Sequence, residues 1–468
     1  MNILLINLCL RPDSPLKLVP IGLAYIATAM KNAGFDFDLL DIDAERLNQE
    51  KVEAFIQKED YDVVCMGCIV TGYRIVKNLA AVVRKLLPRA IIVAGNSVAT
   101  SIVDTLLMRT EVDIAVIGEG DNTIVDLLQT LARNGDWSTV AGISFRQDGL
   151  IVKTVQRPLI KDLSLLPFVD FSLFDIETYI STSSQTLADP LPFPRECARA
   201  LPVNTARGCI ANCTFCYHVF KGHPYRYRKA QHLVGEIRQM LELYRLNYIS
   251  LWDELTFFSK NQTIEFCETI LSGNLNFYWA GSCRGNLFTE ESDLEIMRLM
   301  KMAGCVRMGY SLESADEGIL KAMNKRVTVQ QFSRQTQMFK KAGIPVVTSL
   351  VFGFPQETPE TIRKTFDCCI ENGIYPSCGY LLPQPGSKMY EYALEHGYIT
   401  DQEEYLLSMG DRQDLRLNMT QMSDEEFEGH LAEGLRRCNE MLGIGLDESS
   451  LIKTTYYRGT KDSLGSDS

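Results

Sequence analysis

The chain has 468 residues, of which 46% are hydrophobic and 23% are charged, a composition typical of a globular protein with two or three domains. The net charge of -12, without a long block of Lys or Arg, argues against duplex nucleic acid or an anionic membrane as the main partner. No apolar run reaches the ~18 residues of a membrane span, and the first ten residues lack the basic segment of a signal peptide. Fourteen cysteines, mostly in apolar stretches, indicate a reducing compartment, so we expect a cytoplasmic protein.

Residues 1–135 alternate short apolar strands with helices. The expected strands are 2–7, 36–41, 62–67, 90–95 and 113–118, and the helices begin near Ile21, Ala44, Tyr73, Val98 and Asn122. This alternation predicts an α/β domain with a Rossmann-like doubly wound sheet, which binds its ligand outside the carboxyl ends of the strands. Small and polar residues at those ends are the candidate cofactor-binding residues: Thr71, Gly95, Asn96, Ser97, Gly118, Glu119 and Gly120.

The glycines at 118 and 120 only partly match a dinucleotide fingerprint. Thr123 stands where the third Gly belongs, and the stretch follows the fifth strand instead of the first. We therefore do not expect NAD.

Residues 136–194 are expected to connect two domains. The stretch 143–175 is typical of a small hairpin followed by a connection with Pro and aromatic residues, and 181–194 is rich in turn-forming residues. We assign this segment as a hairpin and linker.

The stretch RGCIANCTFC places Cys209, Cys213 and Cys216 in a C-x3-C-x2-C spacing. Structural zinc would need a fourth ligand, which only His218 or His223 lies close enough in sequence to supply. An iron-sulfur cluster with four irons and four sulfurs, bound at three irons by thiolates, would leave the fourth iron open for a non-protein ligand. An open iron indicates chemistry at that site.

Strands and helices alternate again across residues 195–400. The strands are expected at 201–207, 247–253, 276–284, 305–314, 344–355 and 374–383, with helices at 230–245, 261–272, 290–304, 328–343 and 358–373. This pattern predicts a partial parallel (β/α)6 barrel, whose active site lies at the carboxyl ends of the strands. Residues at those ends include Asp253, Glu254, Arg284, Ser311, Glu313, Gly353 and Glu357.

The cysteine motif, with the aromatic Phe215 just before its last cysteine, resembles the signature of the radical S-adenosylmethionine (SAM) enzymes. Residues 303–328 and 349–361 also resemble recurrent stretches of that family. The resemblance implies a 4Fe-4S cluster on the three cysteines, SAM on the open iron, and an electron from the cluster that cleaves SAM to a 5′-deoxyadenosyl radical. A flavodoxin or ferredoxin would supply that electron.

The same resemblance assigns SAM contacts at the carboxyl ends of the strands. It implies that Asp253 and Glu254 bind the amino group, Arg284 the carboxylate, and Ser311 with Glu313 the ribose side. Phe215 and Gly353 complete the expected cofactor site. An ordinary strand-end or helix-cap role remains open for each of these residues.

The N-terminal domain resembles the cobalamin-binding module that precedes the barrel in one radical SAM subgroup, most closely at 19–35 and 113–121. Residues 1–200 contain no histidine, and the D-x-H-x-x-G motif is absent. The resemblance therefore implies cobalamin held without a histidine ligand from this domain. A sheet that binds no corrinoid and only covers the mouth of the barrel remains an alternative.

The C-terminal region, 401–468, is expected to be helical and small. Residues 423–442 form an amphipathic pattern, with Ser423 as the N-cap and Glu426 three residues later, and the tail 458–468 is expected to be disordered.

Taken with the resemblance, the sequence predicts cobalamin-dependent methylation of an unactivated carbon in a small molecule or natural product. Two alternatives stay open: a radical dehydration or redox rearrangement without corrinoid, and a non-enzymatic corrinoid or metal carrier. The methylthiotransferases that modify tRNA share the barrel, but Cys9, Cys65 and Cys68 lack the spacing of their additional cluster.

Overall fold

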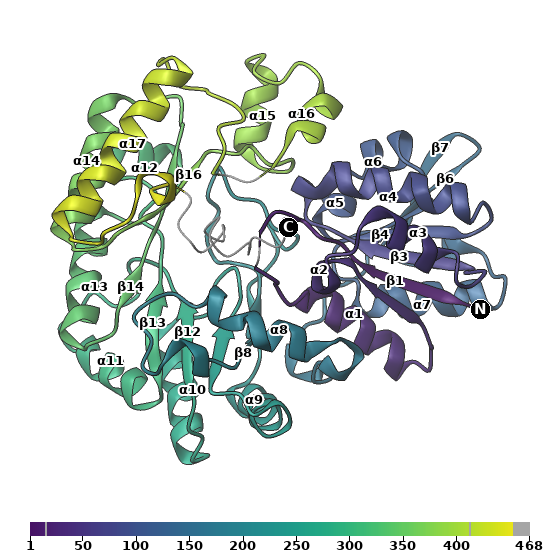
Figure 1. Ribbon diagram of the computed structural model, residues 1–468, viewed down its shortest axis with the longest axis horizontal. Coiled ribbons are helices and arrows are strands. Elements are labelled where there is room, and N and C mark those ends of the chain that lie inside the picture. The colour runs from purple at the N-terminus through teal and green to yellow at the C-terminus, as the bar shows by residue number, and fades with distance from the viewer. Residues whose placement is uncertain (15, 411–412, 453–468) are drawn as a thin grey trace, which may run out of the picture.

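The computed structural model describes residues 1–14, 16–410 and 413–452. It contains an N-terminal α/β unit, purple to blue in Figure 1, beside a larger unit whose strands form an arc with helices outside. Across the described ranges, every helix is too short or too polar to pass through a membrane. The tail 458–468 lies outside the described residues, so the expectation of disorder there is not addressed.

The N-terminal sheet has the strand order β2-β1-β3-β4-β5-β6-β7, and its first five strands are parallel. These strands are β1 (Ile3–Asn7), β2 (Asp38–Asp41), β3 (Val63–Gly67), β4 (Ile91–Gly95) and β5 (Ile114–Val116). The helices are α1 (Ile21–Asn32), α2 (Ile42–Glu45), α3 (Gln49–Ile56), α4 (Tyr73–Leu86), α5 (Asn96–Ser101), α6 (Val103–Arg109) and α7 (Asp121–Ala132). The doubly wound sheet predicted from sequence is confirmed.

Both faces of this sheet are buried, which is why its strands are continuously apolar. Helices α1 and α7 pack on one face, and α3, α4, α5 and α6 pack on the other. The chain leaves β1 toward β2 on one side and returns to β3 on the other, so a crevice opens at the carboxyl ends of β1 and β3.

The hairpin of β6 (Ile143–Gln147) and β7 (Leu150–Lys153) continues this sheet, antiparallel to β5. From sequence we assign it to the linker, but Ile143 and Phe145 are buried in the core of the N-terminal unit. The hairpin therefore belongs with that unit in space. The domain limits 1–135, 136–194, 195–400 and 401–468 stay predictions.

The connection from the hairpin to the barrel contains α8 (Ile176–Thr182), which the sequence pattern does not predict. Its Tyr179 hydroxyl donates to Asp41 and accepts from the Asn7 side chain at 3.0 Å, which fixes the connection to the end of the N-terminal sheet. Single 3-10 turns complete the described chain: η1 (Val70–Gly72), η2 (Trp137–Thr139), η3 (Leu163–Leu165), η4 (Phe171–Leu173), η5 (Ser183–Thr186), η6 (Arg195–Cys197) and η7 (Glu448–Ser450).

The larger unit is the predicted partial barrel. One sheet has the order β14-β13-β12-β11-β8, all parallel, and β15 pairs with β16. The strands are β8 (Ala200–Val203), β11 (Tyr248–Leu251), β12 (Tyr278–Ser282), β13 (Cys305–Gly309), β14 (Val346–Val347), β15 (Ser349–Phe352) and β16 (Ser377–Tyr380). The expected fifth strand is split at Thr348, and a bridge between Glu313 and Leu350 continues the arc.

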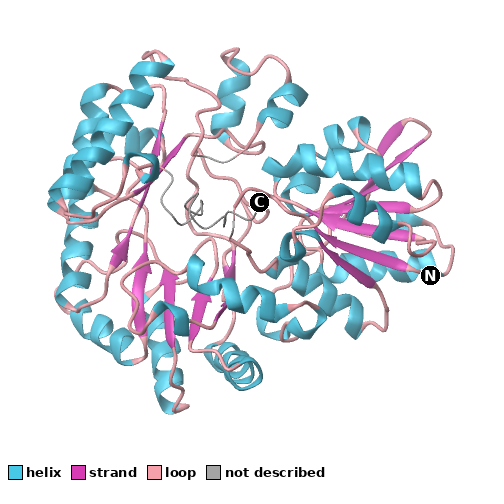
Figure 2. Ribbon diagram, in the orientation of Figure 1, coloured by secondary structure: helices cyan, strands magenta, loops and turns pink. Residues whose placement is uncertain are grey.

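Helices cover the outside of the arc (Figure 2). They are α9 (Ala230–Tyr244), α10 (Lys260–Ser272), α11 (Asp293–Met302), α12 (Glu317–Ala322), α13 (Val329–Lys341), α14 (Pro359–Glu371) and α17 (Asp424–Met441). Helices α15 (Lys388–Glu395) and α16 (Gln402–Ser408) instead lie toward the N-terminal unit, where α16 contacts α4. The sequence pattern predicts all of the longer ones but not α12, α15 or α16.

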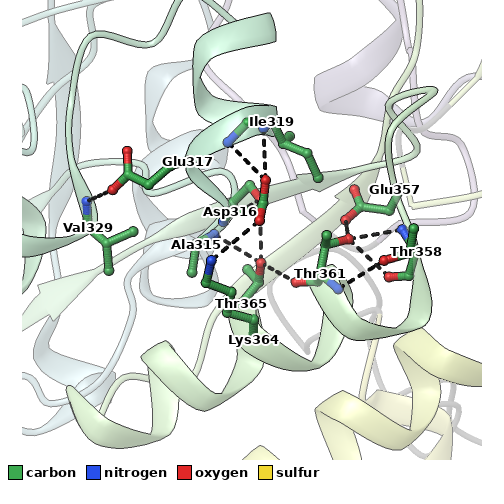
Figure 3. Close-up of polar contacts among 12 residues, drawn as sticks. Ala315, Asp316, Glu317, Ile319, Val329, Glu357, Thr358, Thr361, Lys364 and Thr365 are labelled. Atoms are coloured by element: carbon green, nitrogen blue, oxygen red, sulfur yellow. Dashed lines mark hydrogen bonds and ion pairs between the residues drawn. The ribbon is translucent and has the colours of Figure 1, made fainter.

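Side-chain caps fix where α12 and α14 begin (Figure 3). The Asp316 carboxylate accepts hydrogen bonds from the backbone N–H groups of Gly318 and Ile319, at 2.9 and 3.1 Å. Thr358 and Thr361 form a capping box at the start of α14. Each cap satisfies backbone donors that a helix leaves unpaired.

The predicted C-terminal helix is confirmed as α17, with the expected capping box between Ser423 and Glu426. Gly434 lets α17 approach α14 closely, because a Cβ there would come within 2.0 Å of Phe366. This helix therefore forms part of the barrel wall.

Candidate active site

The three cysteines lie on the loop between β9 (Ala206–Arg207) and β10 (Arg226–Tyr227), two short antiparallel strands that close its base. The Thr214 backbone N–H donates to the Met323 carbonyl at 2.9 Å, and the Thr214 hydroxyl donates to the Ala322 carbonyl at 3.0 Å. The Lys221 ammonium donates to the carbonyls of Cys213, at 2.7 Å, and Cys216. The Thr214 hydrogen bonds thus attach the loop to the end of α12, and the Lys221 hydrogen bonds stabilise its own fold.

The three thiols influence one another. Burial, together with the neighbouring Cys213 and Cys209, raises the pKa of Cys216 to about 12, although the charge of Lys221 opposes the shift. Burial also raises the pKa of Cys213, against the opposing charges of Lys325 and Arg284. Thiolates here therefore need a cationic partner, as iron provides. In the described part of the chain, no three His, Cys, Asp or Glu side chains are grouped for a metal ion, the three cysteines included, so this geometry favours neither zinc nor a cluster.

Three charged side chains, Arg284, Lys325 and Glu313, lie near Cys213. The Arg284 guanidinium donates to the carbonyls of Lys325 and Arg326, and the Lys325 ammonium pairs with Glu313 Oε1 at 2.8 Å. The second oxygen of Glu313, Oε2, is buried and has no hydrogen-bond partner. A buried acceptor without a donor fits a bound hydroxyl-bearing ligand, as the expected ribose contact requires.

Asp253 is engaged by its own surroundings. Its carboxylate accepts four hydrogen bonds, from the backbone N–H groups of Thr205 and Ala206 and from the hydroxyls of Thr205 and Thr256, at 2.7 to 3.1 Å. Burial, with a smaller contribution from the charge of Glu254, raises its pKa to about 7, although the hydrogen bonds from Ala206 and Thr205 act to lower it. These contacts join the end of β8 to the end of β11 and favour a structural role for Asp253.

The remaining expected residues of the barrel occupy different settings. Phe215 packs edge-on against Phe354, with ring centroids 6.2 Å apart. Gly353 has a φ of 112°, which only glycine adopts readily, and its N–H donates to Glu357 Oε2 at 3.4 Å. Glu357 also accepts from the Thr361 hydroxyl at 2.6 Å (Figure 3), and burial raises its pKa to about 7. Ser311 is half-buried.

An open cavity of about 720 Å³, which we call the barrel cavity, lies against the barrel strands and is also lined by Leu16, Leu18, Thr186 and Leu187. Asp253 and Glu254 line it together with residues of five strands, β11 to β15, among them Ser250, Ser282 and Arg307. Glu254 makes one hydrogen bond, accepted from the Gly208 N–H at 3.3 Å, at the start of the cysteine loop. The volume suits a small-molecule site.

A second cavity, of about 350 Å³, lies at the carboxyl ends of the N-terminal strands. Five of the residues expected there line it: Gly95, Asn96, Gly118, Glu119 and Gly120. Its other wall comes from the barrel and the cysteine loop, through Asn204, Ala206, Arg207, Val219, Phe220 and Glu254. The N-terminal cavity therefore adjoins the cysteine loop, and Glu254 lines both cavities.

Thr71 and Ser97 are not among the residues lining the N-terminal cavity. The Ser97 hydroxyl accepts from the Val70 N–H at 2.8 Å, so it fixes the turn η1 instead. No histidine lines the cavity either, and its glycines leave the strand ends open. The lining thus combines apolar side chains and glycines with the charged groups of Glu119, Asp121, Arg207 and Glu254, and offers no imidazole.

A buried ion network joins the two units. Arg207 donates to both oxygens of Asp121 and to Glu119, each at 2.8 Å, and Arg226 also donates to Glu119 at 2.8 Å. Glu119 accepts a further hydrogen bond from the Ile160 N–H at 2.8 Å. Burial would raise the pKa of Asp121, but the charge and hydrogen bonds of Arg207 outweigh burial and lower it.

Sequence reasoning missed Arg207, Lys221 and Lys325. Arg207 directly precedes the Gly-Cys that opens the motif, and a charged residue at a strand end was the available signal. Lys325 lies twelve residues beyond its partner Glu313, on a loop with no motif of its own.

Two different family models match the N-terminal unit and the barrel. The family model described as the B12 binding domain matches residues 10–128, and that of the radical SAM superfamily matches residues 203–369. The chain is a radical SAM protein with a B12 binding domain. The resemblance and the fold class expected from sequence are thereby confirmed.

Relatives of this radical SAM protein cover most of its length. It is 26% identical over 409 residues to an uncharacterized methyltransferase of Pyrococcus horikoshii, with 85% of each chain covered. It is 25% identical over 352 residues to the anaerobic magnesium-protoporphyrin IX monomethyl ester cyclase of Cereibacter sphaeroides, covering 74% of this chain and 55% of the cyclase.

Among solved structures, the fold is similar to that of the radical SAM methyltransferase TsrM from Kitasatospora setae. The TM-score is 0.67 at 18% identity, with 85% of this chain and 75% of TsrM covered. At this identity the likeness concerns the fold.

Proposed function

We propose that this protein is a cobalamin-dependent radical SAM methyltransferase that methylates a carbon of a small molecule. The observation that carries the proposal is the placement of the two cavities. The cavity of the B12 binding domain adjoins the cysteine loop, and Glu254 lines both it and the barrel cavity. A methyl carrier in the first cavity and a substrate in the second would lie next to each other. TsrM, which has a similar fold, is a methyltransferase whose structure holds cobalamin and a [4Fe-4S] cluster.

In this proposal Cys209, Cys213 and Cys216 hold the cluster, which when bound supplies the electron that cleaves SAM. Arg284 orients the SAM carboxylate, and the unpaired Glu313 Oε2 accepts a hydrogen bond from the ribose side. We assign the SAM amino group to Glu254, because the four hydrogen bonds to Asp253 leave its carboxylate occupied.

The source of the electron is a further part of the proposal. The cluster needs an external electron for each cleavage of SAM, and we assign a separate flavodoxin or ferredoxin as the reductant.

Turnover with SAM carrying a labelled methyl group tests the proposal. We expect S-adenosylhomocysteine and 5′-deoxyadenosine in comparable amounts, with the label in the product, because one SAM donates its methyl group while a second yields the radical. Chromatography with mass detection measures all three.

One relative is named a cyclase and not a methyltransferase, so a radical rearrangement is the rival reaction to methyl transfer. A radical rearrangement would give 5′-deoxyadenosine without S-adenosylhomocysteine and without transfer of label. A label-free product that forms equally well without added cobalamin would contradict methyl transfer.

Cobalamin, when bound, would act as the methyl carrier, and the lining of the N-terminal cavity predicts its EPR spectrum. Because no histidine lines the cavity, protein loaded with cobalamin and reduced to the Co(II) state is expected to lack nitrogen superhyperfine splitting in its EPR spectrum. Resolved splitting would require an imidazole from a more distant histidine or from the cofactor's own base. Absence of binding would contradict a methyl carrier in this cavity.

A further inference from the structure

Arg307 is a buried cation without a partner. It lies on β13 and is 5% exposed, and its Nε and Nη2 atoms are buried with no hydrogen-bond acceptor. No carboxylate of the described chain forms an ion pair with it. A buried guanidinium in this state is costly, because desolvation is not offset by a counter-charge.

A β-bulge directs Arg307 into the barrel. The register of β12 and β13 shifts between Trp279 and Ala280, so Trp279 pairs with Cys305 whereas Ala280 pairs with Arg307. The extra residue, Val306, reverses the alternation of side chains, as bulges do. Arg307 and Ala280 consequently both line the barrel cavity.

The surroundings of Arg307 suit an anion that arrives with a ligand. Ser250, Ser282 and Ser349 line the same cavity with small hydroxyls, whereas Leu16, Leu18 and Trp252 contribute apolar surface. The carboxylates that line the cavity are Asp253 and Glu254, and neither pairs with Arg307. The cavity of about 720 Å³ leaves room for a small molecule beside the guanidinium.

We propose that Arg307 binds an anionic group, a carboxylate or a phosphate, of the molecule that this enzyme methylates. The substrate would combine an apolar body with that anion, because guanidinium binds both groups through paired hydrogen bonds. This inference rests on the proposed function, since it places the methyl acceptor in the barrel cavity.

The strand register places Arg307 at a different depth in the barrel from Arg284, the residue proposed to bind the SAM carboxylate. Arg284, the residue assigned to the SAM carboxylate, follows the end of β12 at Ser282 and lies beside Cys213. Arg307 pairs with Ala280, inside the strand. Arg307 therefore lies deeper in the barrel than the cysteine loop.

Binding of simple probes to the reconstituted protein, saturated with SAM, tests the inference. The probes are 3-phenylpropionate and phenyl phosphate, with 3-phenylpropionamide as the neutral match, measured by calorimetry. We expect the wild type to bind at least one anion about tenfold or more tightly than the amide, and Arg307→Met to lose that preference. Arg307→Lys should keep part of it, and the two anions distinguish carboxylate from phosphate.

Arg298→Met, which removes an exposed arginine on α11, is the matched control and should bind the probes like the wild type. Without probe, Arg307→Met should melt at the same or a higher temperature than the wild type, whereas loss of a structural contact would lower the melting temperature. Equal binding of anion and amide by the wild type would overturn the inference. Weaker SAM binding by Arg307→Met would also overturn it, because the anion that Arg307 binds would then be the SAM carboxylate.

These outcomes are independent of methyl transfer. If labelled SAM transfers no methyl group, the proposed function fails, while the probes still report whether Arg307 binds an anion. If label is transferred but the probes bind without regard to charge, only the assignment of Arg307 fails.

Discussion

Cys209→Ala, Cys213→Ala and Cys216→Ala are each expected to reduce 5′-deoxyadenosine formation to the background rate. Each thiolate would hold a different iron, so a variant with two cysteines cannot keep a cluster of about four irons in place. Iron content and absorbance after anaerobic reconstitution measure the loss of the cluster, and chromatography of SAM products measures the loss of cleavage.

Cys305→Ala is the matched control, since Cys305 is a buried cysteine on the barrel strand β13 and its thiol donates only to the Arg307 carbonyl. It should lose some stability but keep its iron and its SAM cleavage. A single variant at 209, 213 or 216 that retained full iron and cleavage would remove the cluster assignment. Stoichiometric zinc without iron would favour the structural alternative.

Local patterns in the sequence are enough to predict the elements that form the frame of this protein. The apolar strands of the N-terminal sheet carry their own signal, because burial on both faces makes them continuously apolar. Ser423 and Glu426 likewise predict the start of α17, because a capping box needs only residues three positions apart. The cysteine spacing predicts the loop for the same reason.

Contacts between distant parts of the chain carry no such signal. The hairpin at 143–153 looks like a connection in sequence, and only pairing with β5 shows that it extends the sheet. Asp253 lies at a strand end, which predicts a ligand-binding residue, whereas its hydrogen bonds to residues 47 and 48 positions earlier, which join β8 to β11, leave no pattern in the sequence. The bulge that turns Arg307 inward depends on the register of two strands, which hydrophobic alternation does not fix.

The second large effect is expected on stability, when Arg207 is removed from the buried ion network that it forms with Glu119 and Asp121. Arg207→Met is expected to lower the free energy of unfolding by about 3–5 kcal/mol, the usual cost of removing one partner from a buried ion pair. The Asp121 and Glu119 side chains are only 7% and 4% exposed, so water cannot replace the guanidinium. Chemical denaturation with paired measurements on the wild type gives the difference.

The pH dependence of this loss has a definite sign. With Arg207 present the pKa of Asp121 is lowered, so in the wild type its contribution to stability persists well into the acidic range and is lost only as the pH falls through the folded pKa. Without Arg207, burial would raise that pKa, and protonation in mild acid would relieve part of the cost. The deficit of Arg207→Met should therefore be smaller in mild acid than at neutral pH.

Arg298→Met again provides the control, because its pair with Glu295 is exposed and such pairs contribute about 0–1 kcal/mol. Arg207→Met should also weaken cobalamin binding, since Glu119 and Asp121 lie in the lining of the N-terminal cavity and Arg207 holds them there. Equal loss of stability in both variants would mean that the network contributes no more than a surface pair. Full stability with weakened cobalamin binding would limit the role of Arg207 to the cavity. Because Arg207 immediately precedes the cysteine loop, loss of both properties together would show that one side chain connects the cavity, the loop and the stability of the joined units.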